Sequence, residues 1–145
     1  MNVARVAAAA VISWVVYLGV SFLVHGVLLK DIYMQHVGAM RPEAEASAIL
    51  PIGFGFALVG FFAFAYVYAR GYRGGGVAEG VVFGLMTGIL LCAFGTIWDY
   101  MVWPVSRTLT ALWMVDYLAE FVLYGAITGA VYKPLHQPSR INSAV

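Results

Sequence analysis

Four long apolar segments take up most of this 145-residue chain. They cover residues 6–29, 49–69, 80–103 and 109–132, and short polar stretches separate them. Each has the roughly 20 residues that a helix needs to cross the hydrocarbon core of a bilayer. Hydrophobic residues make up 63% of the chain and charged residues 10%, against about 45–50% and 25% in soluble domains. The sequence therefore predicts an all-α membrane protein, a single domain over residues 1–145 with four transmembrane helices in an antiparallel bundle.

Composition also narrows the possible partners. The single cysteine, Cys92, excludes a disulfide framework and a CxxC metal or redox site. A net charge of +1 with scattered basic residues argues against nucleic acid and leaves the lipid bilayer as the expected surroundings. The first apolar run is longer than the core of a signal peptide, so we expect it to stay in the protein as a helix.

Basic residues near the helix ends predict the orientation, because cytoplasmic loops carry an excess of lysine and arginine. One side of a four-span chain would carry Arg5, Arg70, Arg73, Lys133 and Arg140, and the other side Lys30, Arg41 and Arg107. This bias favours a multi-pass protein of the bacterial inner membrane with both termini in the cytoplasm, and a dual topology stays open. In the turn after the second helix, Arg70 and Arg73 are also expected to contact lipid headgroups.

Aromatic residues gather near both predicted membrane surfaces, as interfacial belts do. The inner belt is Tyr66, Tyr68, Tyr72 and Tyr132, and the outer belt is Trp98, Tyr100, Trp103 and Trp113. We therefore expect these rings to lie at the boundary between lipid and water.

Glycines recur every four residues around the third apolar segment, at Gly76, Gly80, Gly84 and Gly88, and the fourth segment adds Gly125 and Gly129. Small residues let two membrane helices approach closely, which is a main source of attraction in lipid. The spacing predicts a glycine zipper that packs the third helix on the fourth. Use of the same stripe in a homo-oligomer or against a partner subunit stays open.

The second apolar segment distributes bulky rings around the helix rather than along one face. These rings are Phe54, Phe56, Phe61, Phe62, Phe64, Tyr66 and Tyr68. Such a helix is expected to face lipid or another subunit. Pro42 followed by Glu43 and Glu45 is typical of a first helical turn, so the helix is expected to begin before the membrane.

Four ionisable residues lie within the predicted spans, namely His25, Asp99, Asp116 and Glu120. Such side chains are costly in lipid and normally face the bundle interior, where they mark functional sites. Counting about 1.5 Å per residue, His25 and Asp99 lie roughly 6 Å below the outer surface. Asp116 and Glu120, which share a helix face, lie roughly 10 and 15 Å deep. The four residues can therefore line one vestibule that opens outward. The alternative is a structural role, in which His25 pairs with Asp99 or Asp116 to fix the order of the helices and Glu120 is protonated and hydrogen-bonded. No residue is assigned a catalytic role.

Three chemistries can use such a cluster. Glu120 beside Asp116 can bind and release protons, as ion-coupled transporters require. Carboxylates and His25 can hold a divalent metal, although the Glu-x-x-His pairs of di-iron bundles are missing. His25 can also ligate a tetrapyrrole, although a bis-histidine haem needs a second membrane histidine, and His36 and His136 lie in a loop and in the tail. Metal and cofactor therefore stay unassigned.

The segment 25–33, which reads HGVLLKDIY, and the glycine-spaced third helix together resemble small four-helix bacterial membrane proteins of unassigned function. The resemblance covers the first helix and part of the third, and it implies no activity. The chain is also similar in size to small multidrug transporters, but their membrane glutamate lies in the first helix, where this chain has His25.

The sequence favours a non-enzymatic protein, because it offers no complete catalytic constellation. The function expected first is that of an accessory or assembly subunit of a larger inner-membrane complex. The alternative is a small ion- or proton-coupled transporter that uses Glu120 and Asp116, and a weaker one is a cofactor- or metal-binding protein that uses His25. An enzyme that acts on lipid through an unfamiliar site also stays open.

Overall fold

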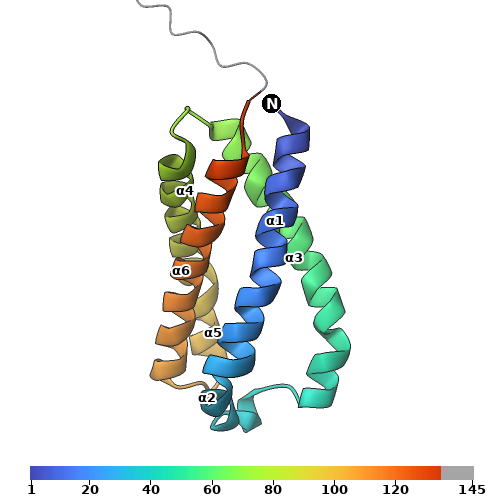
Figure 1. Ribbon diagram of the computed structural model, residues 1–145. Helices are drawn as coiled ribbons and strands as arrows, with labels where there is room; N and C mark the ends of the chain where they lie inside the picture. Colours follow the sequence, from blue (N-terminus) through green and yellow to red (C-terminus); the bar gives the residue numbers. More distant parts are fainter. Residues whose placement is uncertain (135–145) are drawn as a thin grey trace, which may run out of the picture.

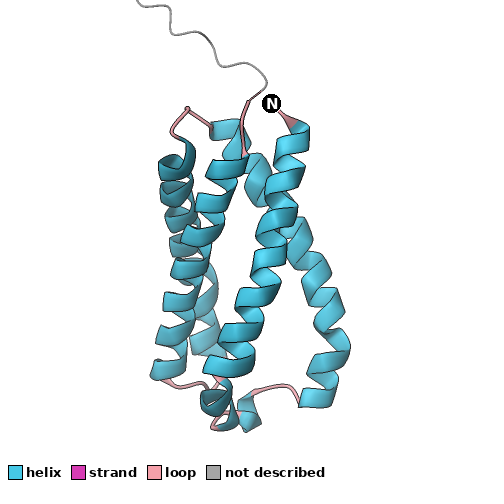
Figure 2. Cartoon of the chain, viewed as in Figure 1, coloured by secondary structure: helices cyan, strands magenta, loops and turns pink. Residues whose placement is uncertain are grey.

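The computed structural model describes residues 1–134, and this part of the chain forms helices and no strands (Figure 2). Four helices are long and apolar enough to cross a membrane. The first is α1 (Val3–Ser21) with its π-helical continuation η1 (Phe22–Leu28), and the second is α3 (Glu43–Gly71). The third joins α4 (Gly76–Leu91), the π-helical segment η3 (Cys92–Thr96) and α5 (Ile97–Val102), and the fourth is α6 (Arg107–Val131). Between the first two lie α2 (Lys30–Met34) and a 3-10 turn, η2 (Val37–Ala39).

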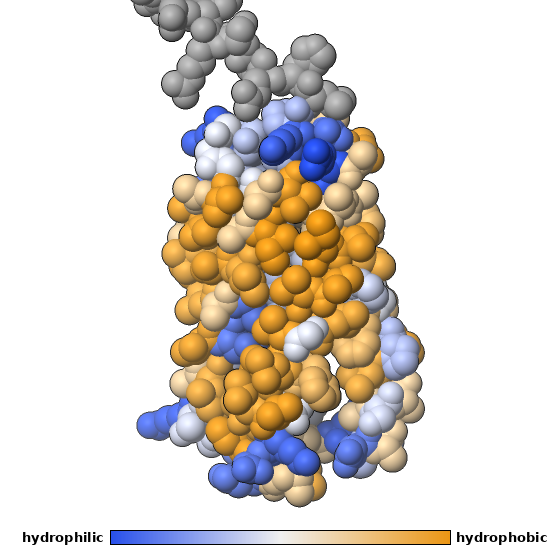
Figure 3. All heavy atoms as spheres, viewed as in Figure 1, coloured by the Kyte–Doolittle hydropathy of each residue, from blue (hydrophilic) through white to orange (hydrophobic). Residues whose placement is uncertain are grey.

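The four long helices lie side by side and define two ends of the molecule (Figure 1). The start of α1, the turn between α3 and α4, and the end of α6 lie at one end, which we call the amino end. The other end holds α2 and the turn between α5 and α6, and we call it the α2 end. Hydrophobic side chains cover most of the body between them in the view of Figure 3, and hydrophilic residues gather at both ends. This is the surface distribution that a bilayer-spanning bundle requires.

Each long helix begins before its predicted span, and polar side chains cap the starts of α1 and α6. The side chain of Asn2 accepts a hydrogen bond from the backbone N–H of Arg5 (3.2 Å), and the Ser106 hydroxyl accepts one from that of Leu109 (3.2 Å). Such side-chain acceptors satisfy backbone donors that a helix leaves free in its first turn. The helix α3 begins at Glu43, with two glutamates in its first turn and Pro51 inside it. It therefore starts well before the predicted span.

The core lies toward the amino end, where the second half of α3 packs against α1 and α6. The buried residues Phe61, Phe64, Ala65 and Tyr68 of α3 form one cluster with small residues of α1 and with Tyr124 and Tyr132. The rings of Phe61 and Tyr124 meet edge to face, with centroids 4.9 Å apart. The prediction that this helix faces lipid or another subunit is therefore wrong for one face of its second half, where rings at helical spacing fill the core. The exposed rings of Phe62 and Tyr66 lie on its other face.

Two of the tyrosines predicted at the lipid boundary lie in this core instead. Tyr68 and Tyr132 are each 2% exposed, and the Tyr68 hydroxyl donates to the carbonyl oxygen of Gly76 (2.8 Å). That carbonyl is at the start of α4, so the hydrogen bond ties the turn between α3 and α4 to the core. Position near a helix end does not distinguish a ring that faces lipid from one that faces the bundle.

The first half of α3 diverges from the bundle toward the α2 end (Figure 1). Its side chains are open to the surroundings, with Ile52 61% and Phe56 75% exposed. One polar contact crosses to α1, where the Trp14 indole N–H donates to the carbonyl oxygen of Phe54 (2.9 Å). The two halves of α3 therefore differ in their surroundings.

The helices α4 and α6 pack through glycines of both helices. A Cβ atom added at Gly80 would overlap the carbonyl of Gly125, and one added at Gly84 would overlap the carbonyl of Phe121. At Gly88 the added atom would lie 3.3 Å from the Cα of Leu118. Added Cβ atoms at Gly125 and Gly129 would overlap the carbonyls of Gly80 and Gly76. The two backbones are therefore closer than any side chain at these positions allows.

Candidate functional site

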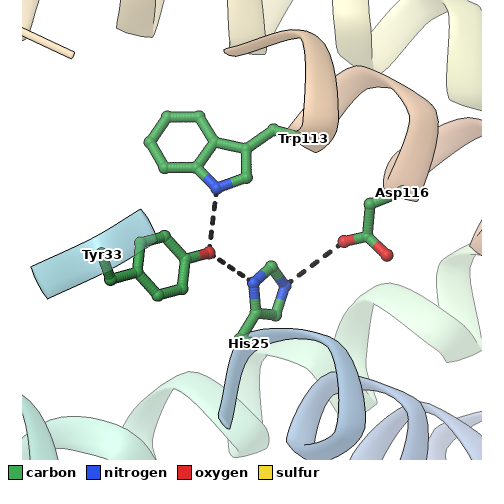
Figure 4. Close-up of polar contacts among 4 residues, drawn as sticks. All are labelled: His25, Tyr33, Trp113 and Asp116. Carbon is green, nitrogen blue, oxygen red and sulfur yellow. Dashed lines mark hydrogen bonds and ion pairs between the residues drawn. The ribbon is translucent and has the colours of Figure 1, made fainter. Parts of the chain in front are cut away.

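A chain of polar contacts centred on His25 joins three parts of the molecule near the α2 end (Figure 4). The His25 Nε2 atom lies 3.3 Å from the carboxylate of Asp116 on α6. Its Nδ1 atom lies 2.6 Å from the hydroxyl of Tyr33 on α2, and the same hydroxyl accepts a hydrogen bond from the Trp113 indole (2.9 Å). We call these four residues the His25 network.

The π-helical segment η1 carries His25 into this network. A π-helical turn holds more residues than an α-helical turn, so it changes the direction in which the side chains after it point, and such segments are frequent at functional sites. The Asp116 side chain is 9% exposed and that of His25 is 40% exposed. The pair is therefore reachable from one side and enclosed by protein on the other.

The donors fix the direction of the hydrogen bonds when the imidazole is neutral. An indole N–H only donates, so the Tyr33 oxygen accepts from Trp113 and its own proton is free to go to Nδ1 of His25. Nδ1 is then an acceptor, and Nε2 carries the ring proton toward the Asp116 carboxylate. The opposite tautomer would set a lone pair of Nε2 against that carboxylate. The neutral network therefore has one favoured arrangement of protons.

Tyr33 is held by α2, outside the long helices. Burial raises the pKa of its hydroxyl above the ordinary value of 10.0; the Trp113 hydrogen bond opposes this rise, and the nearby Asp116 carboxylate adds to it. The phenol is therefore protonated at neutral pH. It has one proton to give and lone pairs with which to accept.

Glu120 lies one helical turn from Asp116 toward the middle of α6 and is 6% exposed. Its Oε1 atom is buried without a hydrogen-bond partner among the described residues. The same is true of the hydroxyls of Tyr124 and Thr128, which follow at four-residue intervals. We call Asp116, Glu120, Tyr124 and Thr128 the polar stripe of α6. Buried polar atoms normally find partners, so a row of three unpartnered ones is unusual.

The polar stripe of α6 faces α1. The rings of Tyr124 and Tyr17 lie with centroids 6.4 Å apart, and Asp116 contacts His25 near the other end of the first long helix. On α1 itself, the Ser13 hydroxyl is fully buried and also has no hydrogen-bond partner among the described residues. Both α1 and α6 therefore carry buried groups that can exchange hydrogen bonds, from His25 toward the amino end.

Asp99 does not join the His25 network. It lies on α5 with an exposed side chain and lines a separate open pocket together with Trp113. The structure thus brings His25 and Asp116 together, places Glu120 one turn deeper and leaves Asp99 in the lining of a separate pocket. The single vestibule lined by all four residues is replaced by an ion pair, a buried acid and a separate pocket.

Two members of the network, Tyr33 and Trp113, were not predicted as site residues. Trp113 precedes Asp116 by three positions on α6, a spacing that puts both on one helix face, so helical periodicity contains its signal. Tyr33 follows His25 across a helix break, and its placement depends on how α2 folds back over the bundle. The local sequence has no comparable signal for that contact.

Metal and tetrapyrrole chemistry at His25 meet a geometric obstacle. Both ring nitrogens face protein partners, so ligation would require breaking the contact to Tyr33 or to Asp116. Within residues 1–134, no group of three or more His, Cys, Asp or Glu side chains is arranged to hold a metal ion. His36 instead accepts a hydrogen bond from the backbone of Ser106 (3.2 Å), and His136 lies outside the described residues.

The predicted headgroup residues Arg70 and Arg73 are exposed at the amino end. The turn beside them is ordered by Glu79, whose carboxylate accepts hydrogen bonds from the backbone N–H groups of Arg73 and Gly75 (2.8 Å each). The positive φ of Gly74 (98°) fits the tight bend that results. Both guanidinium groups are therefore presented outward from a fixed turn.

No protein-family model, curated protein or solved structure matches this chain.

Proposed function

We propose that the four long helices cross the bacterial inner membrane as an antiparallel bundle with both termini in the cytoplasm. The hydropathy and length of the helices support this arrangement. Of the described basic residues, Arg5, Arg70, Arg73 and Lys133 belong to the amino end, and Lys30, Arg41 and Arg107 to the α2 end. Arg140, which adds to the first group, lies outside the described residues. The amino end then faces the cytoplasm.

Within that frame, the protein acts as a small proton-coupled carrier whose proton-binding groups are the His25–Asp116 pair and Glu120. The observation that carries this proposal is the 3.3 Å contact between His25 and Asp116. Glu120, a buried glutamate with an unpartnered oxygen, follows Asp116 by one helical turn. Ionisable side chains are expensive at membrane depth and are found there chiefly in proton relays and ion pathways. A merely structural pair would not require a second buried acid on the same face.

Proton movement follows from the hydrogen-bond directions. A proton that arrives at Nδ1 of His25 makes an imidazolium paired with the Asp116 carboxylate, and the Tyr33 hydroxyl turns its own proton away. Glu120 is the next group inward that can take up a proton. The buried hydroxyls of Tyr124, Thr128 and Ser13 continue the polar lining toward the amino end. Because these hydroxyls have no hydrogen-bond partner among the described residues, a proton path through them requires water molecules that connect them, which hydroxyls can bind as both donors and acceptors.

Proton flux into vesicles tests this function. The full chain is reconstituted in liposomes that contain a pH-sensitive dye, and a potassium gradient with valinomycin sets the membrane potential. The wild type is expected to acidify the lumen faster than empty vesicles do, and Glu120→Gln, which keeps the shape but holds no exchangeable acid, is expected to match empty vesicles. Asp31→Asn, which changes an exposed carboxylate on α2, is the matched control and should retain wild-type flux. Equal flux in the wild type and in Glu120→Gln would contradict the proposal.

A second candidate is an accessory or assembly subunit of a larger inner-membrane complex, and the divergent first half of α3 favours it. The exposed rings there, such as Phe56, offer a surface that another membrane protein would cover. A photo-crosslinking amino acid at Phe56 should capture a defined protein in native membranes, whereas the same group at the buried Phe64 should not. Capture of lipid alone at Phe56 would contradict this second proposal, and capture of a second copy would indicate a homo-oligomer.

A further inference from the structure

An open pocket of about 250 Å³ lies at the α2 end, next to the His25 network. Its lining is Met40, Asp99, Trp103, Val105 and Trp113. Val105 is buried, whereas Asp99 and Trp103 are exposed, so the pocket has a fixed apolar floor and a rim open to the surroundings. None of the lining residues is basic.

The lining combines one carboxylate with two indole rings and a thioether. Among the described residues, Asp99 forms no ion pair, since the ion pairs there join His25 to Asp116 and Arg41 to Glu45. Indole is the aromatic ring that attracts cations most strongly over its face. The pocket lining therefore combines a carboxylate with two aromatic rings, and it contains no basic residue.

The chemistry of the lining selects among cations. A metal ion such as Ca²⁺ or Mg²⁺ takes six or more oxygen ligands, and Asp99 is the only carboxylate in the lining. A primary ammonium needs three hydrogen-bond acceptors, but the Trp113 N–H is a donor and is already used by Tyr33. A methylated ammonium group has no such hydrogen bonds to satisfy. Its spread positive charge and apolar surface suit indole rings beside a carboxylate.

We propose that this pocket binds a small quaternary ammonium group, with Asp99 as counter-ion and Trp103 and Trp113 as cation–π surfaces. The chemical class is shared by free cations such as choline and by the headgroup of a choline lipid. Trp113 links the pocket to the His25 network, because its N–H bonds the Tyr33 hydroxyl that contacts His25. If the proposed proton carrier is correct, on which this last step rests, the quaternary ammonium is the substrate class whose binding is coupled to protonation of His25.

Binding is tested first and separately from transport. Isothermal titration calorimetry of the full chain in a maltoside detergent compares choline with 3,3-dimethyl-1-butanol, which has the same shape and no charge. Choline is expected to bind, and the neutral alcohol is expected to bind about tenfold more weakly or worse. Asp99→Asn should weaken choline binding by about tenfold, whereas Asp31→Asn, an exposed carboxylate elsewhere at the same end, should leave it unchanged.

A tryptophan pair provides the second control. Trp103→Leu should weaken choline binding, whereas Trp98→Leu, which changes an exposed indole outside the pocket lining, should have no effect. Equal binding of choline and the neutral alcohol, or wild-type binding by Asp99→Asn, would overturn the proposal. Absence of choline binding in detergent and in phosphatidylglycerol nanodiscs would also overturn it.

Nanodiscs separate the two sources of the cation. Choline binding in phosphatidylglycerol nanodiscs that is lost when phosphatidylcholine is added identifies the lipid headgroup as an occupant. Choline binding that survives this addition identifies a free cation, and both results support the ammonium site. Choline binding in a protein whose proton flux is unaffected by Glu120→Gln would keep this site and overturn only the proton carrier. Proton flux that depends on Glu120, in a protein that does not bind choline, would keep the proton carrier and overturn the ammonium site.

Discussion

Two faces of α6 differ in how they meet the neighbouring helices. The face toward α4 carries Gly125 and Gly129, and it brings two backbones so close that no side chain fits between them. The face toward α1 carries the polar stripe of α6, where buried oxygens of Glu120, Tyr124 and Thr128 have no hydrogen-bond partner among the described residues. In the bilayer proposed for this bundle, lipid offers no hydrophobic drive for helix association, so close packing is expected to hold the first face together. The second face keeps polar groups that packing alone would replace with apolar ones.

The difference indicates how stability and function are divided. Polar side chains that lack partners in a low-dielectric interior reduce stability, typically by about 1–3 kcal/mol each. A bundle that tolerates such a row needs firm packing elsewhere, and the glycine face supplies it. Changes on the glycine face should therefore act on folding, whereas changes on the polar face should act on proton chemistry with smaller effects on folding.

The largest effect on stability is expected from Gly84→Val, which disrupts the close packing of α4 on α6. A side chain at this position overlaps the carbonyl of Phe121, which is backbone and cannot move aside without separating the helices. The free energy of unfolding in detergent should fall by about 3 kcal/mol or more. Gly60→Val on α3 is the matched control, because nothing lies within 4 Å of a Cβ added there. Equal stability losses in the two variants would show that close contact on this face does not hold the bundle.

Tyr33→Phe removes the hydroxyl group that joins His25 to Trp113 in the His25 network. It leaves the Trp113 N–H and the Nδ1 atom of His25 without their shared partner, at an expected cost of about 1–2 kcal/mol. Thermal unfolding measures the loss, and the emission of Trp113 should change with it. Tyr66→Phe removes the hydroxyl of a half-exposed ring on α3 and serves as the control. A Tyr33 variant as stable as the Tyr66 variant would contradict the network.

Two substitutions at Asp116 sharpen the contrast between packing and proton chemistry. Asp116→Ala removes the partner of His25 and should lower the free energy of unfolding by about 1 kcal/mol, because the pair is partly exposed. Asp116→Asn keeps an acceptor for Nε2 but cannot pair with an imidazolium, so it should be nearly as stable as the wild type. Both should lose proton flux in vesicles. Wild-type flux in Asp116→Asn would mean that the carboxylate charge has no part in proton movement.

The smallest effect is expected away from both faces. Arg41 and Glu45 form an exposed ion pair (3.3 Å) one turn apart before and within α3, with side chains 57% and 61% exposed. Arg41→Ala should therefore change the free energy of unfolding by less than about 0.5 kcal/mol. A chemical-denaturation curve that overlays the wild-type curve checks this baseline, and a loss as large as that of Asp116→Ala would show that this end of the molecule depends on more than packing.

The fold was predictable because bilayer-spanning helices follow from length and hydropathy. The interval of four between Gly80, Gly84 and Gly88 also predicts a face of small residues, and that face is where α6 packs. The burial of Tyr68 and Tyr132 was not predictable in this way. Their position near helix ends is the same for a core ring as for a lipid-facing one, and only the rotation of each helix decides between them.

The candidate site was predictable in part. Four-residue spacing placed Asp116 and Glu120 on one face, and their depth singled out Glu120. The contact between Tyr33 and His25 depends on the path of α2, and the exposure of Asp99 depends on the rotation of α5, which follows the π-helical segment η3. Neither the path of α2 nor the exposure of Asp99 can be predicted from hydropathy.

The central claim is that the polar stripe of α6 takes up protons, and infrared difference spectroscopy of the reconstituted protein tests it most directly. The carbonyl stretch of a carboxylic acid appears when a buried carboxylate is protonated. On acidification, the wild type is predicted to gain a band that Glu120→Gln lacks and that Asp31→Asn retains. Identical difference spectra for the wild type and Glu120→Gln would contradict the claim.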